Sequence, residues 1–120
     1  FHEMPVSQIK LWGKIFERID VSGKKVAWSF VLKKDYEETG ASPDDTTGAI
    51  DYLNAVPDGR FCTLIAEDGK GMVKGSLRTR DDSVDVSKIA GLFGGGGHKK
   101  AAGYSFPGHL MEDGSRVTIT

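Results

Sequence analysis

The stretch Gly94-Gly95-Gly96-Gly97-His98-Lys99-Lys100-Ala101-Ala102-Gly103 decides how the rest of this sequence is interpreted. Four successive glycines remove every β-carbon from a loop, so the backbone can adopt φ > 0 and a ligand can approach the main chain closely. Consecutive exposed N–H groups form a concavity that binds anions, and His98 adds a side-chain donor at its end. The segment Gly94, Gly95, Gly96, Gly97 and His98 therefore predicts a binding site for a phosphate group.

Two simpler explanations of the glycine run stay open, a flexible linker and a helix C-cap. Gly94 alone would serve as a cap, and each additional glycine costs about 0.5–1 kcal/mol relative to alanine. The residues from His98 to Ala102 predict the start of a short helix, whose positive end would lie beside the loop. The spacing matches neither the phosphate loop of nucleotide triphosphatases nor the dinucleotide fingerprint, which follows a strand.

A β-hairpin is predicted before the glycine run, with strands over residues 61–66 and 72–79. Because side chains alternate along a strand, Lys74, Ser76 and Arg78 share one face of the second strand. The Arg78 guanidinium is suited to hold a phosphate with two parallel hydrogen bonds. A solvated sheet face is the alternative, since exposed faces are normally polar. The nearby glycine run favours the phosphate-binding interpretation.

The remaining patterns predict an α/β fold in one domain, residues 1–120, with a mixed sheet of about five strands flanked by helices. Apolar residues recur at helical spacing from Pro5 to Ile19. A second helix is expected from Ser42 to about Ala55, and Asp85 caps a third that ends at the glycines. The expected strands cover residues 25–32, 61–66, 72–79, 102–106 and 116–119.

Composition restricts the partners and the compartment. The formal net charge of -1 provides no broad basic field for long duplex nucleic acid, but it permits a small anionic ligand. Cys62 is the only cysteine, so no intrachain disulfide can form and a cytoplasmic location is expected. No signal peptide and no apolar run of membrane-spanning length is found, so no membrane partner is expected.

A metal site is not expected in this chain. The three histidines are isolated, and the paired aspartates Asp44-Asp45 and Asp81-Asp82 are adjacent, so they do not share a helix or strand face. The chain also begins at Phe1 without an initiator methionine, which suggests a piece of a larger protein.

The glycine motif resembles the signature of the DHH-associated domain, the C-terminal domain of the DHH phosphoesterase superfamily. The preceding segments Gly75–Thr79 and Val84–Ala90 and the residue Phe93 match as well, and Asp45–Gly48 resembles a helix start in the same family. The most similar group comprises bacterial enzymes that degrade very short oligoribonucleotides and dephosphorylate 3′-phosphoadenosine 5′-phosphate. The related domain of alanyl-tRNA synthetases typically lacks the histidine. RecJ-type exonucleases usually have a shorter glycine run, and cyclic dinucleotide phosphodiesterases usually depart from the Ala-Ala-Gly ending.

This resemblance implies a two-domain enzyme. An N-terminal domain with an Asp-His-His motif holds two divalent metals, usually manganese, which activate a water for attack on phosphorus. The C-terminal domain closes over the cleft and binds the substrate. By the resemblance, Arg78 and the loop Gly94–His98 grip the phosphate or the terminal nucleotide, with Ser76 as their neighbour. Charge and position add three further cations, Lys74, Arg80 and Lys99.

The Asp-His-His motif is absent from this chain. The chain is therefore expected to be the substrate-binding half of a phosphoesterase, inactive alone, without catalytic residues or a cofactor of its own. Its expected partners are its own N-terminal DHH domain and a short oligonucleotide or nucleotide bisphosphate. A stand-alone nucleic-acid-binding module stays open, as does the equivalent domain of a RecJ-type exonuclease or a cyclic dinucleotide phosphodiesterase. A third alternative makes the glycine run a hinge in a dimerisation domain, and a homodimer stays open as well.

Overall fold

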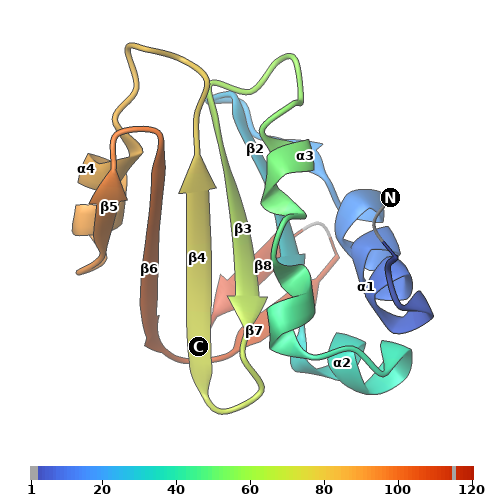
Figure 1. Ribbon diagram of the computed structural model, residues 1–120. Coiled ribbons are helices and arrows are strands. Elements are labelled where there is room, and N and C mark those ends of the chain that lie inside the picture. The colour runs from blue at the N-terminus through green and yellow to red at the C-terminus, as the bar shows by residue number, and fades with distance from the viewer. Residues whose placement is uncertain (1–2, 115) are drawn as a thin grey trace.

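A mixed sheet of six strands forms the centre of the molecule in the computed structural model, which describes residues 3–114 and 116–120 (Figure 1). Strands β2 and β3 are parallel, and every other neighbouring pair in the sheet is antiparallel. The strand order is β1 (Asp20–Val21), β2 (Val26–Val31), β3 (Phe61–Glu67), β4 (Met72–Arg78), β6 (Ala101–Pro107) and β5 (Gly96–His98). The α/β class with a mixed sheet is confirmed.

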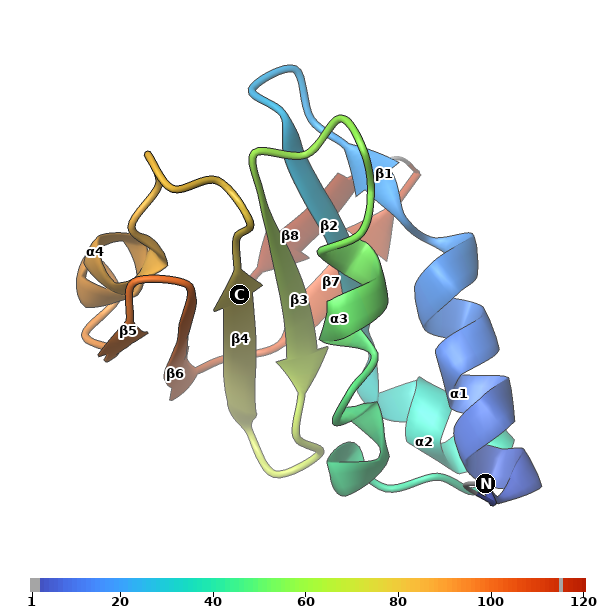
Figure 2. The same ribbon diagram turned by 45° about the horizontal axis from the view of Figure 1, so that its top comes forward.

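Helices cover one face of the sheet over β2 and β3. Helix α1 (Val6–Glu17) and the short helix α3 (Ile50–Leu53) pack there (Figure 2). The apolar spacing of α1 brings Leu11 and Ile15 fully into this core, against residues of both strands. Helix α2 (Lys33–Thr39) follows β2 directly and adds Tyr36 to the same core. On this face, β2 and β3 are therefore covered by helices and form part of the hydrophobic core.

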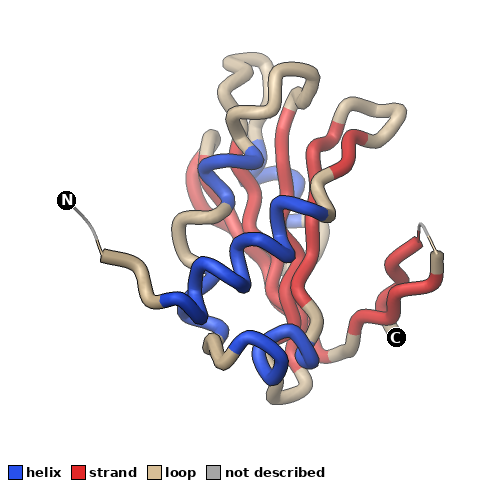
Figure 3. The backbone as a smooth tube through the Cα atoms, turned by 90° about the vertical axis from the view of Figure 1, so that its right-hand side faces the viewer, coloured by secondary structure: helices blue, strands red, loops and turns tan. Residues whose placement is uncertain are grey.

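The opposite face is covered by different elements. Helix α4 (Val86–Gly91) packs its apolar residues against Leu77 of β4 and Ala102 of β6. A separate hairpin of β7 (Leu110–Asp113) and β8 (Arg116–Ile119) covers β2, β3 and β4 on that side, away from α1 (Figure 3). The strand expected over residues 116–119 is confirmed, but it lies in this second sheet and not in the central one.

The helices between β2 and β3 differ from the prediction in two ways. The helix predicted from Ser42 to Ala55 is divided into the 3-10 helix η1 (Pro43–Thr46) and α3. Between them Gly48 adopts φ 95°, and a β-carbon there would lie 3.4 Å from the Trp12 ring. Glycine therefore breaks the helix where the chain passes over α1. Helix α2 was missed because its sequence is short and mostly polar, with no apolar periodicity to indicate it.

An ion pair joins the end of α1 to α2. Arg18 makes two hydrogen bonds to the carboxylate of Asp35, 2.6 and 3.0 Å long, and a third to the Phe30 carbonyl. The Asp35 side chain is completely buried and also accepts a hydrogen bond from the Leu32 N–H. Burial by itself raises the pKa of this carboxyl, but the hydrogen bonds from Arg18 and Leu32 outweigh burial and hold the pKa below its ordinary value.

We expect part of the stability to be lost in acid through Asp35. A carboxyl whose pKa is lowered by folding contributes stability that is complete above its unfolded pKa, about 3.9. That contribution is lost as the pH falls from there through the folded pKa. Urea unfolding followed from neutral pH down to about pH 2 should show a shallower decline below about pH 4 for Asp35→Ala than for the wild type. Equal slopes in the two proteins would contradict this role.

Candidate functional site

The face of the sheet that carries α1 and α3 is open over β6, β5 and the adjoining part of β4, because α1, α3 and η1 lie mainly over β2 and β3 (Figure 1). Along β4 the buried residues Val73, Gly75 and Leu77 alternate with Lys74, Ser76 and Arg78. Lys74 is exposed and the other two are half-buried. The predicted alternation is confirmed. The three polar side chains project from the face of β4 opposite to the one on which α4 packs.

Strand register places residues of the glycine run on this same open face. Arg78 pairs with Ala101, which pairs with His98, and Ser76 pairs with Gly103, which pairs with Gly96. Residues directly opposite each other in antiparallel strands project to the same side. His98 and Arg78 therefore lie two strand spacings apart, about 10 Å, which long side chains can bridge through a bound ligand.

A shallow groove of about 380 Å³ runs across this face. It is lined by Lys74, Ser76, Tyr104 and Ser105, and its floor is largely backbone, from Gly75, Gly94, Gly95 and Gly103. Arg78 and His98 do not line the groove itself. They lie on the same face, towards the β5–β6 turn. Sequence reasoning missed Ser105, although alternation along the predicted strand 102–106 places it on the same face as Gly103.

The four glycines have separate structural roles. Gly94, at φ 79°, closes the turn that follows α4, and the Gly94 and Gly95 N–H groups donate to the carbonyls of Gly91 and Ala90. The C-cap explanation is thus confirmed for Gly94. Because the N–H groups of Gly94 and Gly95 already donate within the chain, these two residues line the groove with backbone and do not offer free donors to a ligand. Gly96 and Gly97 form the edge strand β5, where alternate N–H groups point away from β6.

Packing requires two of the glycines and does not require Gly96. A β-carbon on Gly95 would lie 2.2 Å from the Gly103 carbonyl oxygen, and one on Gly97 would lie 2.6 Å from the Ala102 Cα. A β-carbon on Gly96 would have nothing within 4 Å. Gly96 therefore leaves room above the open face, where a ligand can approach the backbone.

The helix predicted from His98 to Ala102 is wrong. His98 ends β5, Lys99 and Lys100 form a two-residue turn, and Ala101 begins β6. The turn is held by its carbonyls, because Lys99 accepts from the Val86 N–H and Lys100 from the Thr79 N–H. Strand pairing is favoured over a helix in this segment because β6 has a long antiparallel partner in β4.

The other predicted cations lie around the open face. Lys99 is exposed at the tip of the β5–β6 turn, and Arg80 is exposed just beyond the end of β4. His98 is exposed as well, whereas the Arg78 guanidinium donates to the Leu77 carbonyl at 2.9 Å. Only Lys74 and Ser76 of the predicted side chains line the groove, and the rest lie at its end.

Metal ligands do not converge in the part of the chain that the structure describes. No three His, Cys, Asp or Glu side chains of residues 3–114 and 116–120 are grouped so that they could hold a metal ion. The described residues therefore do not fit the two metals that the family resemblance implies. Within these same residues, no helix is long and apolar enough to span a membrane.

Comparison with known proteins identifies the family. The model of the DHHA1 domain matches residues 23–115. The chain is 30% identical over 97 residues to the A-adding tRNA nucleotidyltransferase of Aquifex aeolicus, covering 78% of this chain and 11% of that protein. It is 52% identical over 55 residues to the oligoribonuclease NrnB of Bacillus subtilis, covering 46% of this chain and 14% of that protein. The chain thus spans a small part of the length of these relatives.

A solved structure supports the fold. The exopolyphosphatase-related protein of Bacteroides fragilis superposes with a TM-score of 0.79 at 24% identity, over 87% of this chain and 31% of that one. In related proteins this domain normally accompanies an N-terminal DHH domain. The chain belongs to the DHHA1 domain family, the C-terminal domain of DHH-family phosphoesterases that its glycine motif predicted.

Proposed function

We infer that the open face of β4, β6 and β5 binds the phosphate of a nucleotide or short oligonucleotide for hydrolysis by a DHH domain. The observation that carries this proposal is the strand register. It brings Arg78 and His98, 20 residues apart in sequence, onto one uncovered face with Lys74 and Ser76. Cationic side chains, hydroxyl groups and exposed backbone can all donate hydrogen bonds to the oxygens of a phosphate.

The substrate class is proposed from the relatives. The oligoribonuclease of Bacillus subtilis has the higher identity of the two curated relatives compared above, although over a shorter segment. We therefore propose short oligoribonucleotides as substrates, and the resemblance of the glycine motif adds 3′-phosphoadenosine 5′-phosphate (adenosine 3′,5′-bisphosphate). In such an enzyme the divalent metals, manganese in this proposal, would belong to the DHH domain, and this chain would bind and orient the phosphate.

Removing Arg78 should weaken ligand binding more than removing His98. Loss of a charge-assisted bidentate contact should raise the Kd of the 120-residue chain for adenosine 3′,5′-bisphosphate by about 10- to 100-fold in Arg78→Ala. Loss of a single donor in His98→Ala should raise it by about 2- to 10-fold. Isothermal titration calorimetry, or NMR titration for weak binding, measures both.

Arg116→Ala is the matched control. It removes the same charge from the hairpin β7–β8, which covers the opposite face of the sheet. Its affinity should remain within about twofold of the wild type, because exposed charges that distant are largely screened. Equal losses in Arg78→Ala and Arg116→Ala would mean that net charge and not the open face determines binding.

A further inference from the structure

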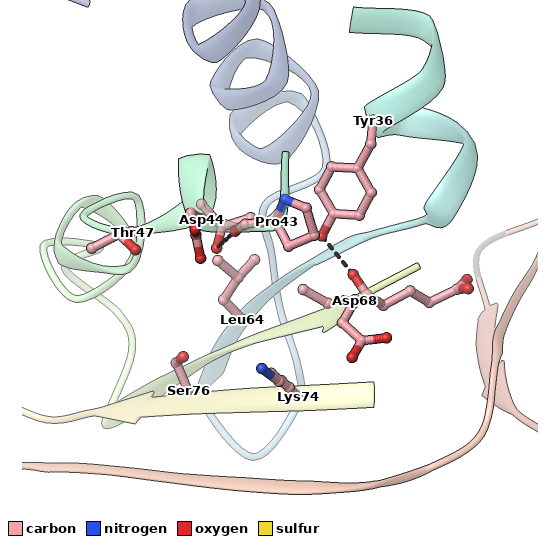
Figure 4. Close-up of a pocket in the computed structure, with 11 residues that line it drawn as sticks. Tyr36, Pro43, Asp44, Thr47, Leu64, Asp68, Lys74 and Ser76 are labelled. Atoms are coloured by element: carbon pink, nitrogen blue, oxygen red, sulfur yellow. Dashed lines mark hydrogen bonds between the residues drawn. The ribbon is translucent and has the colours of Figure 1, made fainter. Parts of the chain in front are cut away.

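A second cavity adjoins the phosphate groove on the same face of the sheet. It has a volume of about 210 Å³ and lies between η1 and the strands β3 and β4 (Figure 4). Lys74 and Ser76 line both the cavity and the groove, so these two side chains form a shared wall. A ligand seated in the groove would therefore have its adjoining chemical group next to, or inside, this cavity.

The lining of the cavity differs in charge from that of the groove. Asp44 and Asp68 contribute carboxylates, and Thr46 and Thr47 contribute hydroxyls. Leu64 and Ala66 form an apolar floor, which is closed at one end where the Tyr36 hydroxyl donates to the Glu67 carbonyl. A second phosphate would be repelled by the two carboxylates. The cavity is suited to an uncharged group that carries hydrogen-bond donors.

Asp44 is the acceptor best placed for such a group. Its side chain points from η1 into the space opposite Lys74 and Ser76 (Figure 4). None of the hydrogen bonds described among residues 3–114 and 116–120 uses the Asp44 carboxylate. By contrast, one oxygen of Asp68 accepts from the Lys70 and Met72 N–H groups, which keeps the pKa of Asp68 below its usual value. Asp68 therefore has a structural role in the turn before β4.

Spacing and volume favour a sugar as the occupant. The groove lies over β4 and β6 and the cavity over β3 and β4, so their centres are offset by one strand spacing, about 4.8 Å. That is the scale of the separation between a phosphate and the sugar bonded to it. At about 210 Å³ the cavity is smaller than the neighbouring groove of about 380 Å³, a size that suits one ring and not a whole dinucleotide.

We propose that this cavity holds the ribose of the bound nucleotide, with the Asp44 carboxylate accepting a hydrogen bond from its 2′-hydroxyl. The 2′-hydroxyl is the group by which a protein distinguishes RNA from DNA. Asp44 is then a specificity-determining residue that selects ribonucleotides. The inference rests on the proposed function, because the phosphate in the neighbouring groove brings the sugar to the cavity.

The test uses two ligands that differ by one hydroxyl group. Adenosine 5′-monophosphate and its 2′-deoxy counterpart, which carry a single phosphate, are titrated into the 120-residue chain, into Asp44→Ala and into Asp51→Ala. Asp51→Ala is the control, because it removes an equal charge from the exposed surface of α3 outside the cavity. A hydrogen bond to a carboxylate predicts that the wild type and Asp51→Ala bind the ribose ligand about tenfold more tightly than the deoxy ligand. In Asp44→Ala this ratio should fall to about one.

Each outcome separates this inference from the function on which it rests. A ratio near one in the wild type, or an unchanged tenfold ratio in Asp44→Ala, overturns the role of Asp44. In either case, if both ligands bind the wild type and Arg78→Ala weakens the binding of both, the proposed phosphate site is retained and only the sugar site at Asp44 is rejected. Equal weakening of both ligands in Asp44→Ala would place the carboxylate against the base and also overturns the proposal. Failure of both ligands to bind the wild type overturns the phosphate site and the sugar site together.

Discussion

Asp35→Ala should destabilise the protein by about 3–5 kcal/mol, because it leaves the partly buried guanidinium of Arg18 without its carboxylate partner. The substitution also removes the acceptor of the Leu32 N–H, which is buried in the wild type. Typical domains unfold with only 5–15 kcal/mol, so a change of this size should lower the urea midpoint substantially. Urea unfolding at neutral pH measures the effect.

Glu38→Ala is the matched control for this prediction. Glu38 accepts a hydrogen bond from Lys14 at 2.7 Å, but its side chain is half exposed. Exposed ion pairs contribute about 0–1 kcal/mol, so the control should be nearly neutral. If both variants lost the same stability, the buried pair would not anchor α1 and α2.

Gly97→Ala should cost about 2–4 kcal/mol. Alanine at φ 146° is strained, and its β-carbon would lie 2.6 Å from the Ala102 Cα, so the backbone of β5 or β6 must move. The expected consequence is loss of the β5–β6 pairing that places His98 opposite Ala101. Urea unfolding measures the stability, and amide hydrogen exchange of residues 96–103 measures the local pairing.

Gly96→Ala provides a control one residue away. A β-carbon there meets no atom within 4 Å, so stability should remain within about 0.5 kcal/mol of the wild type. Because the new methyl group projects over the open face, affinity for adenosine 3′,5′-bisphosphate should fall even though the fold is kept. Equal destabilisation by the two substitutions would contradict the distinct roles assigned to Gly96 and Gly97.

Periodic patterns predicted the elements that position the site. The alternation in β4 correctly separated Lys74, Ser76 and Arg78 from the buried side chains, and Asp85 does cap α4 by accepting from the Ser87 N–H. The glycine motif also predicted the right family. These features depend on neighbours close in sequence, which is why local patterns reveal them.

Features that depend on contacts between residues far apart in the sequence could not be predicted from local patterns. The residues after Gly94 by themselves predict a loop and a helix start, because their strand pairing depends on β6 and, through it, on β4. The division of the helix at Gly48 depends on the Trp12 ring, 36 residues earlier in the chain. The cavity beside Asp44 likewise forms only when η1 is placed over β3 and β4.

Binding of a nucleotide phosphate to the open face of β4, β6 and β5 is tested most directly by recording amide NMR spectra of the 120-residue chain during titration with adenosine 3′,5′-bisphosphate. We expect the shifts to concentrate on residues 74–78 and 94–98, with little change in β7 and β8. No shift at millimolar ligand, or shifts concentrated in the β7–β8 hairpin on the opposite face, would contradict it.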